Sequence, residues 1–561
     1  MFSNKAALFG TTIFGILVVV IVFFRLFYLQ VIEGDKFVKM VERQSDPRFT
    51  IKADRGYIYD NEGRLLAGNK NAYDVYAYGK DIRNKEYLYN VLRDNGVRVT
   101  SKMKNSLSKG DQFTYLARGV DLQRAKRILK KVDGVDSYAV DTRFYPQGTL
   151  MANVVGFTGV DNEGRTGVEY FLDKDLEGKE FHVLSLKDSR RRIIMLEDKR
   201  ELSKADTSVY LTISSRIQGG VEYLLRKGAE NFRAKNGSVV AMDIKTGEII
   251  LSASVKGFNP HLYWKSPVEN WQNHAFNYVF EPGSIFKTVA FSYLHNGNKL
   301  DRNRIIDTSK KVKIGKYTYS DTKYYGMLTV DEIFTHSSNI GMTHLMKNED
   351  KMAFHEFLIS SGFGHKTGIY GASEEAGIIK DVRNWSKTSI TSMAIGYEVL
   401  VTPLQMLRFY AAIANNGIMV NPKIISKIVK HDEVLKPNHE EKQILKPETA
   451  KYMLELMQKT VEAGTGVRAK TAITKVAGKT GTARIYDNTV GDYSTTNYTA
   501  SFAGVFPAED PKVAMVVIYE GPRSSIYGGS TSANIFREIA EFISTEKQYF
   551  EPELKVVANE N

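Results

Sequence analysis

An uncharged, mostly apolar run near the N-terminus, Ala6–Phe24, constrains the fold more than any other feature of the sequence. As an α-helix this run rises ~28 Å, which matches the hydrocarbon core of a bilayer. A cleavable signal peptide would have a shorter apolar region ending in small residues, whereas here an amphipathic segment, Arg25–Gln30, follows directly. We therefore predict a retained transmembrane anchor over residues 6–28, after a cytoplasmic tail of residues 1–5. Lys5 and the amino terminus favour an orientation with the remainder outside the membrane.

The charge of the chain makes an anionic partner worth considering. The 561 residues include 77 Lys and Arg against 64 Asp and Glu, a net charge of +13, which would suit nucleic acid, anionic lipid or a wall polymer. The charge is spread along the chain. Its densest runs, Arg124–Lys131 and Lys187–Arg192, lack the stacking aromatics and zinc-ligand spacing of nucleic-acid-binding modules. We expect solvated basic faces and no nucleic-acid partner.

Thiol and metal chemistry find little support in the composition. The sequence contains no cysteine, which excludes disulfides, thiolate metal sites and cysteine nucleophiles. The ten histidines are scattered, and the one start of a zinc-protease motif, His355-Glu356, has Ile359 where the second histidine ligand must stand. We expect an activity that uses no metal and no cofactor.

Two regions of different character follow the anchor. Residues from about 54 to 200 combine short strands with basic amphipathic helices such as Asp121–Lys131, and contain no convergent catalytic set, which predicts a spacer or docking domain. A second region begins near Asp206. Its pattern predicts strands and helices in the order Asp206–Ile213 (strand), Ser214–Asn231 (helix), Ser238–Asp243 and Glu248–Ser254 (hairpin), Thr499–Phe506 and Val513–Tyr519 (strands), and Ser532–Ile543 (helix). Strands at both ends of a helical middle predict an α+β domain.

The most informative motif is Ser-x-x-Lys from Ser284 to Lys287, which follows Pro282-Gly283. Proline suits a first helical turn, so we expect Ser284 at a helix N-terminus, where backbone N–H groups favour developing negative charge. Lys287 then lies over the same face, within reach of the serine hydroxyl. A buried lysine can act as the base that a serine nucleophile needs. The same spacing recurs without a preceding Pro-Gly bend at Ser101, Ser106, Ser320 and Ser544.

A Ser-x-Asn sequence, Ser337 to Asn339, stands where one helical pattern gives way to another. Ser337 could relay a proton between the lysine and an amine, and Asn339 could bind a substrate amide. An arbitrary Ser-Ser-Asn is more often a capped helix junction, and Ser532–Asn534 is a candidate for that role.

A Lys-Thr-Gly sequence, Lys479 to Gly481, lies inside a strand-like run that continues to Thr482. Two other copies start at Lys245, in a hairpin turn, and at Lys366, in a loop. Only the run at Lys479 can pair with an extended peptide, with glycine leaving room for it. We predict that Lys479 supplies positive charge for a substrate carboxylate, and that the hydroxyls of Thr480 and Thr482 donate to it.

Ser-x-x-Lys, Ser-x-Asn and Lys-Thr-Gly in this order resemble the signature of the penicillin-recognising enzymes, and nearly the whole chain resembles a class B penicillin-binding protein. The spacer region is similar to that family's pedestal in three stretches: Arg55–Asp60 with Gly63 and Leu66-Ala67, Arg143–Pro146 with Gly148, and Gly164 with Gly167–Glu169. The resemblance implies an α+β fold behind one transmembrane helix. Its transpeptidase domain would be of the penicillin-binding and β-lactamase-like type, with an antiparallel sheet and a helical subdomain, on an elongated N-terminal pedestal domain. The implied domains are a pedestal over residues 29–205, a transpeptidase domain over residues 206–550 and a flexible tail over residues 551–561.

The function implied by the resemblance is D,D-transpeptidation of peptidoglycan through a serine ester of Ser284. The backbone N–H groups of Ser284 and Thr482 would form the oxyanion hole, and Lys287, Ser337, Asn339 and Lys479 would be catalytic. Implied partners are stem peptides and lipid-linked precursor strands, β-lactams, and a membrane glycosyltransferase or other wall-synthesis and division proteins. The implied location is the bacterial cytoplasmic membrane, with the catalytic domain outside.

Alternatives remain open at this point. A β-lactamase or a wall-trimming carboxypeptidase would share the three motifs. A β-lactam receptor, or a catalytically idle scaffold in a wall-synthesis complex, would have the spacer as its working part. The anchor and the long pedestal argue against a β-lactamase. The intact motif residues Ser284, Lys287 and Lys479 argue against an idle scaffold. The compact region before Ser284 favours a role in division over elongation or sporulation.

Overall fold

The computed structural model describes residues 3–36, 50–178, 180–182, 185–187, 193–195, 205–315 and 317–546. The chain divides into two compact units that are not contiguous in sequence. Unit 1 comprises Met1–Asp54, Lys70–Thr142 and Glu177–Ala205, and unit 2 comprises Arg55–Asn69, Arg143–Leu176 and Asp206–Asn561. The domain boundaries expected from the sequence stay a prediction, and the tail of residues 551–561 lies outside the described residues.

Unit 1 begins with the apolar helix α1, Ser3–Phe27, which continues as a π-helical turn, η1, Tyr28–Ile32. Within it, the 21 residues Thr12–Ile32 have a mean hydropathy of 2.6. A helix of this length spans ~32 Å, so it is long and apolar enough to cross a membrane. The predicted single N-terminal apolar helix is confirmed.

The rest of unit 1 packs helices against the distal part of strand β3, Leu65–Tyr78, and its neighbours. β4 and β5 both pair with β3, and the core between sheet and helices contains Val75, Leu92 and Ile128. The helix expected over Asp121–Lys131 is present as α5, where Asp121 caps the backbone N–H of Arg124. The remaining elements are α3 Lys85–Asp94, α4 Ser101–Ser108, β4 Phe113–Val120, α5 Leu122–Leu129, β5 Val135–Phe144, β1 Thr50–Lys52, β6 Glu180–His182, β7 Ser185–Lys187 and β8 Ile193–Met195.

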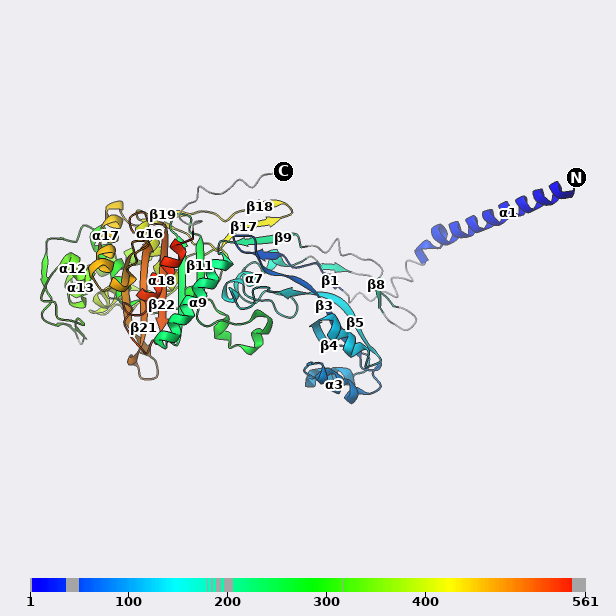
Figure 1. The fold of residues 1–561 in the computed structure, drawn as a ribbon, viewed down its shortest axis with the longest axis horizontal. Coiled ribbons are helices and arrows are strands. Elements are labelled where there is room, and N and C mark those ends of the chain that lie inside the picture. The colour runs from blue at the N-terminus through cyan, green and yellow to red at the C-terminus, as the bar shows by residue number, and fades with distance from the viewer. Residues whose placement is uncertain are drawn as a thin grey trace. The chain divides into compact units, whose positions relative to one another are not determined.

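Unit 2 contains a five-stranded antiparallel sheet in the order β11-β10-β22-β21-β20. Its strands alternate between two cores. In β22, Met515 and Val517 pack into the cluster beneath helices α9 and α18, whereas Val516 and Ile518 face the larger cluster with α16. Figure 1 shows α9 and α18 side by side over the strands. These elements are β10 Asn236–Asp243, β11 Ile249–Ser254, β20 Ala477–Asp487, β21 Asp492–Phe506, β22 Val513–Glu520, α9 Ser215–Phe232, α16 Pro403–Ala414 and α18 Ser532–Ser544.

This arrangement confirms the α+β class, the hairpin and the late closure of the sheet. The last two strands of the unit, β21 and β22, insert between β10 and β20, so the sheet is complete only when residues more than 200 positions apart have paired. β20 is one of the two edge strands of the sheet, as expected for Lys479 to Gly481.

The helical part of unit 2 lies between β11 and β20 in sequence and supplies the larger core. Its elements are η2 Pro260–Lys265, η3 Val268–Trp271, α10 His274–Asn277, η4 Gly283–Phe286, α11 Lys287–Asn296, β12 Ile305–Asp307, β13 Val312–Ile314, β14 Tyr317–Tyr319, β15 Met327–Thr329, α12 Val330–Thr335, α13 Asn339–Met346, α14 Lys351–Ser360, η5 Val382–Asn384, α15 Ser389–Ala394, β16 Ile418–Val420, β19 Glu441–Gln443, α17 Pro447–Ala463 and η6 Val467–Ala469.

Unit 2 also takes in the stretches that resemble pedestal motifs. Strand β2, Tyr57–Tyr59, pairs in parallel with β9, Thr207–Leu211, which pairs in turn with β17, Ile425–Lys430, and β17 with β18, Glu433–Leu435. Three short helices follow: α6 Ala152–Val155, α7 Gly167–Phe171 and α8 Asp173–Leu176.

A buried charge cluster ties these stretches together. Nε of Arg55 donates to Glu169 at 2.7 Å, and Nε of Arg143 donates to the other carboxylate oxygen at 2.6 Å. The carboxylate is fully buried and both guanidinium groups are nearly so, so each charge needs its partners to offset desolvation. Residues separated by 114 positions, Arg55 and Glu169, are thereby held in one place.

Candidate active site

The turn that carries Ser284 is held from both sides. η4 begins at Gly283, whose φ of +55° suits glycine and whose N–H donates to the carbonyl of Gly396 at 3.0 Å. Inside, the hydroxyl of buried Tyr410 donates to the carbonyl of Ile285 at 2.9 Å. Ser284 thus lies in a one-turn 3₁₀-helix that leads directly into α11, close to the predicted helix N-terminus.

Lys287 is completely buried and converges with the second motif. Its Nζ donates to the carbonyl of Ser337 at 2.6 Å and to Oδ1 of Asn339 at 2.7 Å, and lies 3.3 Å from Oγ of Ser337. Burial lowers the pKa of Lys287 to about 7, although the negative charge of Asp321 opposes the shift. The lysine can therefore be neutral near neutral pH, as a base must be.

The second motif is both a capped helix junction and part of the site. Ser338, fully buried, caps α13 by accepting from the N–H of Gly341 at 2.9 Å. Ser337 has a φ of +60°, in the left-handed region that costs a non-glycine residue of order 1 kcal/mol. This turn presents both the carbonyl and the hydroxyl of Ser337 to the lysine.

Asp321 positions that junction and was missed by sequence reasoning. Its Oδ2 accepts from Oγ of Ser338 at 2.6 Å, and its Oδ1 accepts from the N–H groups of Asn339 and Ile340 at 2.5 and 3.1 Å. The neighbouring carbonyl of Ser320 accepts from Nδ2 of Asn339 at 3.1 Å. The loop that contains Asp321 has no periodic sequence pattern. The Ser-x-x-Lys spacing that begins at Ser320 lacks the preceding Pro-Gly bend, and it gives no sign of the role of Asp321.

Lys479 is a second fully buried lysine. Its Nζ donates to the carbonyl of Thr480 at 3.2 Å and lies 5.9 Å from the centre of the Phe334 ring. Burial, and then the charge of Lys287, lower its pKa well below the usual value. Two lysines in one buried site disfavour each other's protonation unless an anion enters.

Strand β20 packs tightly against the Ser284 turn. A Cβ on Gly481 would lie 2.3 Å from Oγ of Ser501 and 3.0 Å from the carbonyl of Pro282. Packing within the protein therefore requires glycine at this position. The sequence had suggested a different reason, namely that glycine leaves room for the substrate. On the other face of the strand, Oγ1 of Thr482 accepts from the N–H of Gly528 at 3.1 Å, and Oγ1 of Thr480 lies 2.7 Å from Oγ1 of Thr465.

The structure thus brings Lys287, Ser337, Asn339 and Lys479 together and sets β20 against the turn of Ser284. The other Lys-Thr-Gly copies lie in different settings. Gly247 occupies the hairpin turn with a φ of +72°, and Thr367 is buried in a loop where its hydroxyl donates to Glu374. Ser532 is buried at the start of α18 and donates to the carbonyl of Ala500; this helix, which is described in full, has no side-chain cap, so the expected capped junction is not seen there.

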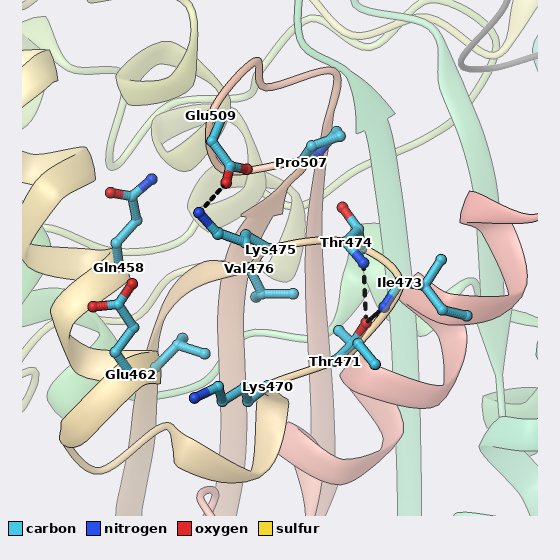
Figure 2. A pocket seen from close by; sticks show the side chains of 12 residues that line it. Gln458, Glu462, Lys470, Thr471, Ile473, Thr474, Lys475, Val476, Pro507 and Glu509 are labelled. Atoms are coloured by element: carbon cyan, nitrogen blue, oxygen red, sulfur yellow. Dashed lines mark hydrogen bonds and ion pairs between the residues drawn. The ribbon is translucent and has the colours of Figure 1, made fainter.

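One cavity lies away from this site. It measures ≈ 690 Å³ and opens between the end of α17, the loop before β20 and the loop after β21. Figure 2 shows Lys475 paired with Glu509 at one edge and Thr471 contacting the backbone at another. Among the described residues, none of the predicted site residues lines it. The described residues also contain no group of three or more His, Asp or Glu placed to hold a metal ion.

In one α+β domain, a serine turn, a buried lysine held by a Ser-x-Asn junction and an adjacent edge strand thus form the candidate site. Comparisons with known proteins identify the family. Residues 237–541 match the penicillin-binding protein transpeptidase domain, and residues 50–211 match the penicillin-binding protein dimerisation domain. The chain belongs to the class B penicillin-binding proteins, as the motifs suggested.

Similar proteins span most of the chain. It is 30% identical over 528 residues to peptidoglycan D,D-transpeptidase FtsI of Escherichia coli, covering 92% of this chain and 87% of that one. It is 28% identical to stage V sporulation protein D of Bacillus subtilis, covering 94% and 83%. Among solved structures, penicillin-binding protein 3 of Mycobacterium tuberculosis in complex with aztreonam has a TM-score of 0.69 at 24% identity, covering 89% and 97%. At that identity the likeness concerns the fold alone.

Proposed function

We propose that this chain is a peptidoglycan D,D-transpeptidase that works through an acyl-enzyme on Ser284. The observation that carries the proposal is the buried Lys287, whose lowered pKa and contacts with Ser337 and Asn339 suit a base next to a serine nucleophile. The similarity to D,D-transpeptidase FtsI of Escherichia coli supports the substrate class.

The first step forms the acyl-enzyme. Neutral Lys287 takes the proton of the Ser284 hydroxyl, and Oγ attacks the carbonyl carbon of the penultimate D-Ala of a stem peptide. The oxyanion is held by the backbone N–H groups of Ser284 and Thr482, a contribution usually worth ~3–4 kcal/mol. The C–N bond to the terminal D-Ala then breaks, and the departing amine receives a proton through Ser337.

The second step transfers the acyl group to an amine. The amino group of a neighbouring stem peptide attacks the ester carbonyl and gives up a proton through Ser337 and Lys287. The bond to Oγ of Ser284 breaks, and the serine regains its proton. Lys479, Thr480 and Thr482 hold the donor's terminal carboxylate during the first step, while the edge of β20 pairs with its extended backbone.

The apolar helix α1 supports an anchor in the bacterial cytoplasmic membrane, with the chain that follows the anchor on the outside. Substrates are stem peptides of lipid-linked or polymerised strands. A membrane glycosyltransferase and division proteins are the expected partners of the anchor and pedestal.

Covalent labelling tests the proposal. A fluorescent penicillin should modify one peptide of the full-length protein, the one containing Ser284, and Ser284→Ala should abolish labelling while the thermal melting temperature stays within about 2 °C, because the substitution removes only one half-exposed hydroxyl. Ser532→Ala is the matched control and should label normally. An adduct on another serine would contradict the assignment, and rapid release of the adduct would point to a β-lactamase.

We further propose a role in septal wall synthesis. A fluorescent fusion expressed at native level should concentrate at midcell. Uniform sidewall fluorescence would contradict the septal role in favour of elongation, and fluorescence confined to sporulating cells would favour the role named for the Bacillus subtilis relative.

A further inference from the structure

A three-residue loop, Gly464–Gly466, links the second and third motifs. It follows α17, and the N–H of Thr465 donates to the carbonyl of Thr335 at 3.3 Å. Thr335 is the last residue of α12 and is separated from the Ser-x-Asn sequence by His336 alone. A Cβ on Gly464 would lie 2.4 Å from that same carbonyl, so the loop reaches this position only because it has glycine there.

The side chain of Thr465 points the other way along this link, to strand β20. Its Oγ1 lies 2.7 Å from Oγ1 of Thr480. Because side chains alternate along a strand, Thr480 and Thr482 share one face of β20. Each of their hydroxyls has one scaffold partner, Thr465 for Thr480 and the N–H of Gly528 for Thr482.

The two hydroxyls differ in what their partners permit. A hydroxyl has one proton and two acceptor positions. The N–H of Gly528 can only donate, so it occupies an acceptor position of Thr482 and leaves that proton for a ligand. Between Thr465 and Thr480 either hydroxyl can be the donor. If Thr480 donates to Thr465, it turns lone pairs towards the ligand.

A carboxylate resolves this choice because it can only accept. When one lies at Thr480, both hydroxyls are satisfied in a single order, in which Thr465 donates to Thr480 and Thr480 donates to the carboxylate. Hydrogen bonds in such a chain strengthen one another. Thr480 and Thr482 then both act as donors, with the charge of Lys479 nearby.

We propose that Thr465 is a positioning residue that donates to the Thr480 hydroxyl, strengthens the hydrogen bond from Thr480 to a bound carboxylate, and so favours stem peptides that end in a free carboxylate. The proposal rests on the function proposed above, since it assigns the terminal carboxylate of the donor to Thr480. It adds a residue outside the three motifs, 15 positions from Thr480 in sequence, that acts on specificity without touching the substrate.

The test compares two donors on the full-length protein in detergent. One is an N-acyl-D-alanyl thioglycolate, which ends in a carboxylate, and the other is the matching thioglycolamide. Thiol release gives kcat/KM for acylation. Wild type should prefer the carboxylate. Thr465→Val should lower kcat/KM for the carboxylate roughly tenfold, mainly through KM, and change the amide less than about twofold.

Controls separate orientation from structure. Thr465→Ser keeps a hydroxyl and should recover most of the loss. If Thr465→Val impairs folding, Thr465→Ala takes its place and should show the same loss of kcat/KM for the carboxylate donor. Thr495→Val, at an exposed position of β21, should match wild type. An equal loss on both donors, an unchanged carboxylate rate, no carboxylate preference in wild type, or no rescue by serine would each overturn the proposal. Failure of the proposed function differs from all of these, because wild type would then form no penicillin adduct on Ser284.

Discussion

Replacing Asp321 with asparagine should reveal how strongly this carboxylate organises the catalytic lysine. Asparagine keeps an acceptor for the two backbone N–H groups but loses the charge and the acceptor for Oγ of Ser338. A hydrogen bond to a charged group contributes ~1.5–3 kcal/mol, against ~1 for a neutral one. We expect the free energy of unfolding to fall by about 1–2 kcal/mol. The maximal acylation rate should fall roughly tenfold, because the same junction holds Lys287.

The pH dependence provides a second and more specific readout. Lys287 must be neutral to accept the serine proton, so acylation by wild type should rise with pH and be half-maximal near its pKa of about 7. The negative charge of Asp321 raises this pKa against the effect of burial. Without that charge the protonated lysine is less stable, its pKa falls further, and the acid limb of the profile moves to lower pH.

The assay is stopped-flow acylation by a fluorescent penicillin over about pH 5 to 9, with chemical denaturation for stability. Asp307→Asn is the matched control, since Asp307 is exposed in the same helical region and its Oδ1 also accepts from a backbone N–H, that of Ser309. An acid limb that stayed in place or moved to higher pH would refute the electrostatic reasoning. An unchanged maximal rate would refute the positioning role.

Three further outcomes follow from the packing. Glu169→Gln leaves buried Arg143 without its carboxylate and Arg55 with Asp173 as its remaining carboxylate partner, and chemical denaturation should show a loss of about 3–5 kcal/mol; a loss below about 1 kcal/mol would contradict the role of the cluster. Gly481→Ala forces Ser501 and the Ser284 turn apart, so thermal melting should show a loss of about 1–3 kcal/mol together with slower penicillin labelling, and normal labelling would contradict it. Removing residues 1–36 should release the protein from membranes on fractionation without detergent, whereas continued pelleting would indicate another membrane contact.

The parts of this fold that were predictable from sequence are those with a local periodic signal. The apolar run Val513–Tyr519 predicts a strand, which is present as β22, and its neighbours Met515 and Val516 enter different cores. The choice among three Lys-Thr-Gly copies also followed from local context, since only Lys479 lies within a strand-like run. Its strand is one of the two edge strands of the sheet.

The parts that were not predictable depend on contacts across long sequence separations. Asp321 acts on Ser338 and Asn339 from an irregular loop, and Thr465 reaches Thr480 only because α17 ends beside the strand. Likewise, Arg55 and Glu169 join two separate stretches of the expected pedestal to each other within unit 2. A side chain in a loop carries no periodicity that would reveal its partner, so these residues become visible only when the chain is folded.

An anionic substrate would affect the protonation of the two buried lysines, Lys287 and Lys479, in opposite directions. In the free site, burial lowers the pKa of both, and the charge of Lys287 lowers that of Lys479 further. A substrate carboxylate bound near Lys479 would favour its protonated form. That restored positive charge would in turn disfavour protonation of Lys287, which is the lysine that has to be neutral. We infer that binding of an anionic substrate gives the two lysines different protonation states, with Lys479 charged and Lys287 neutral when Ser284 attacks.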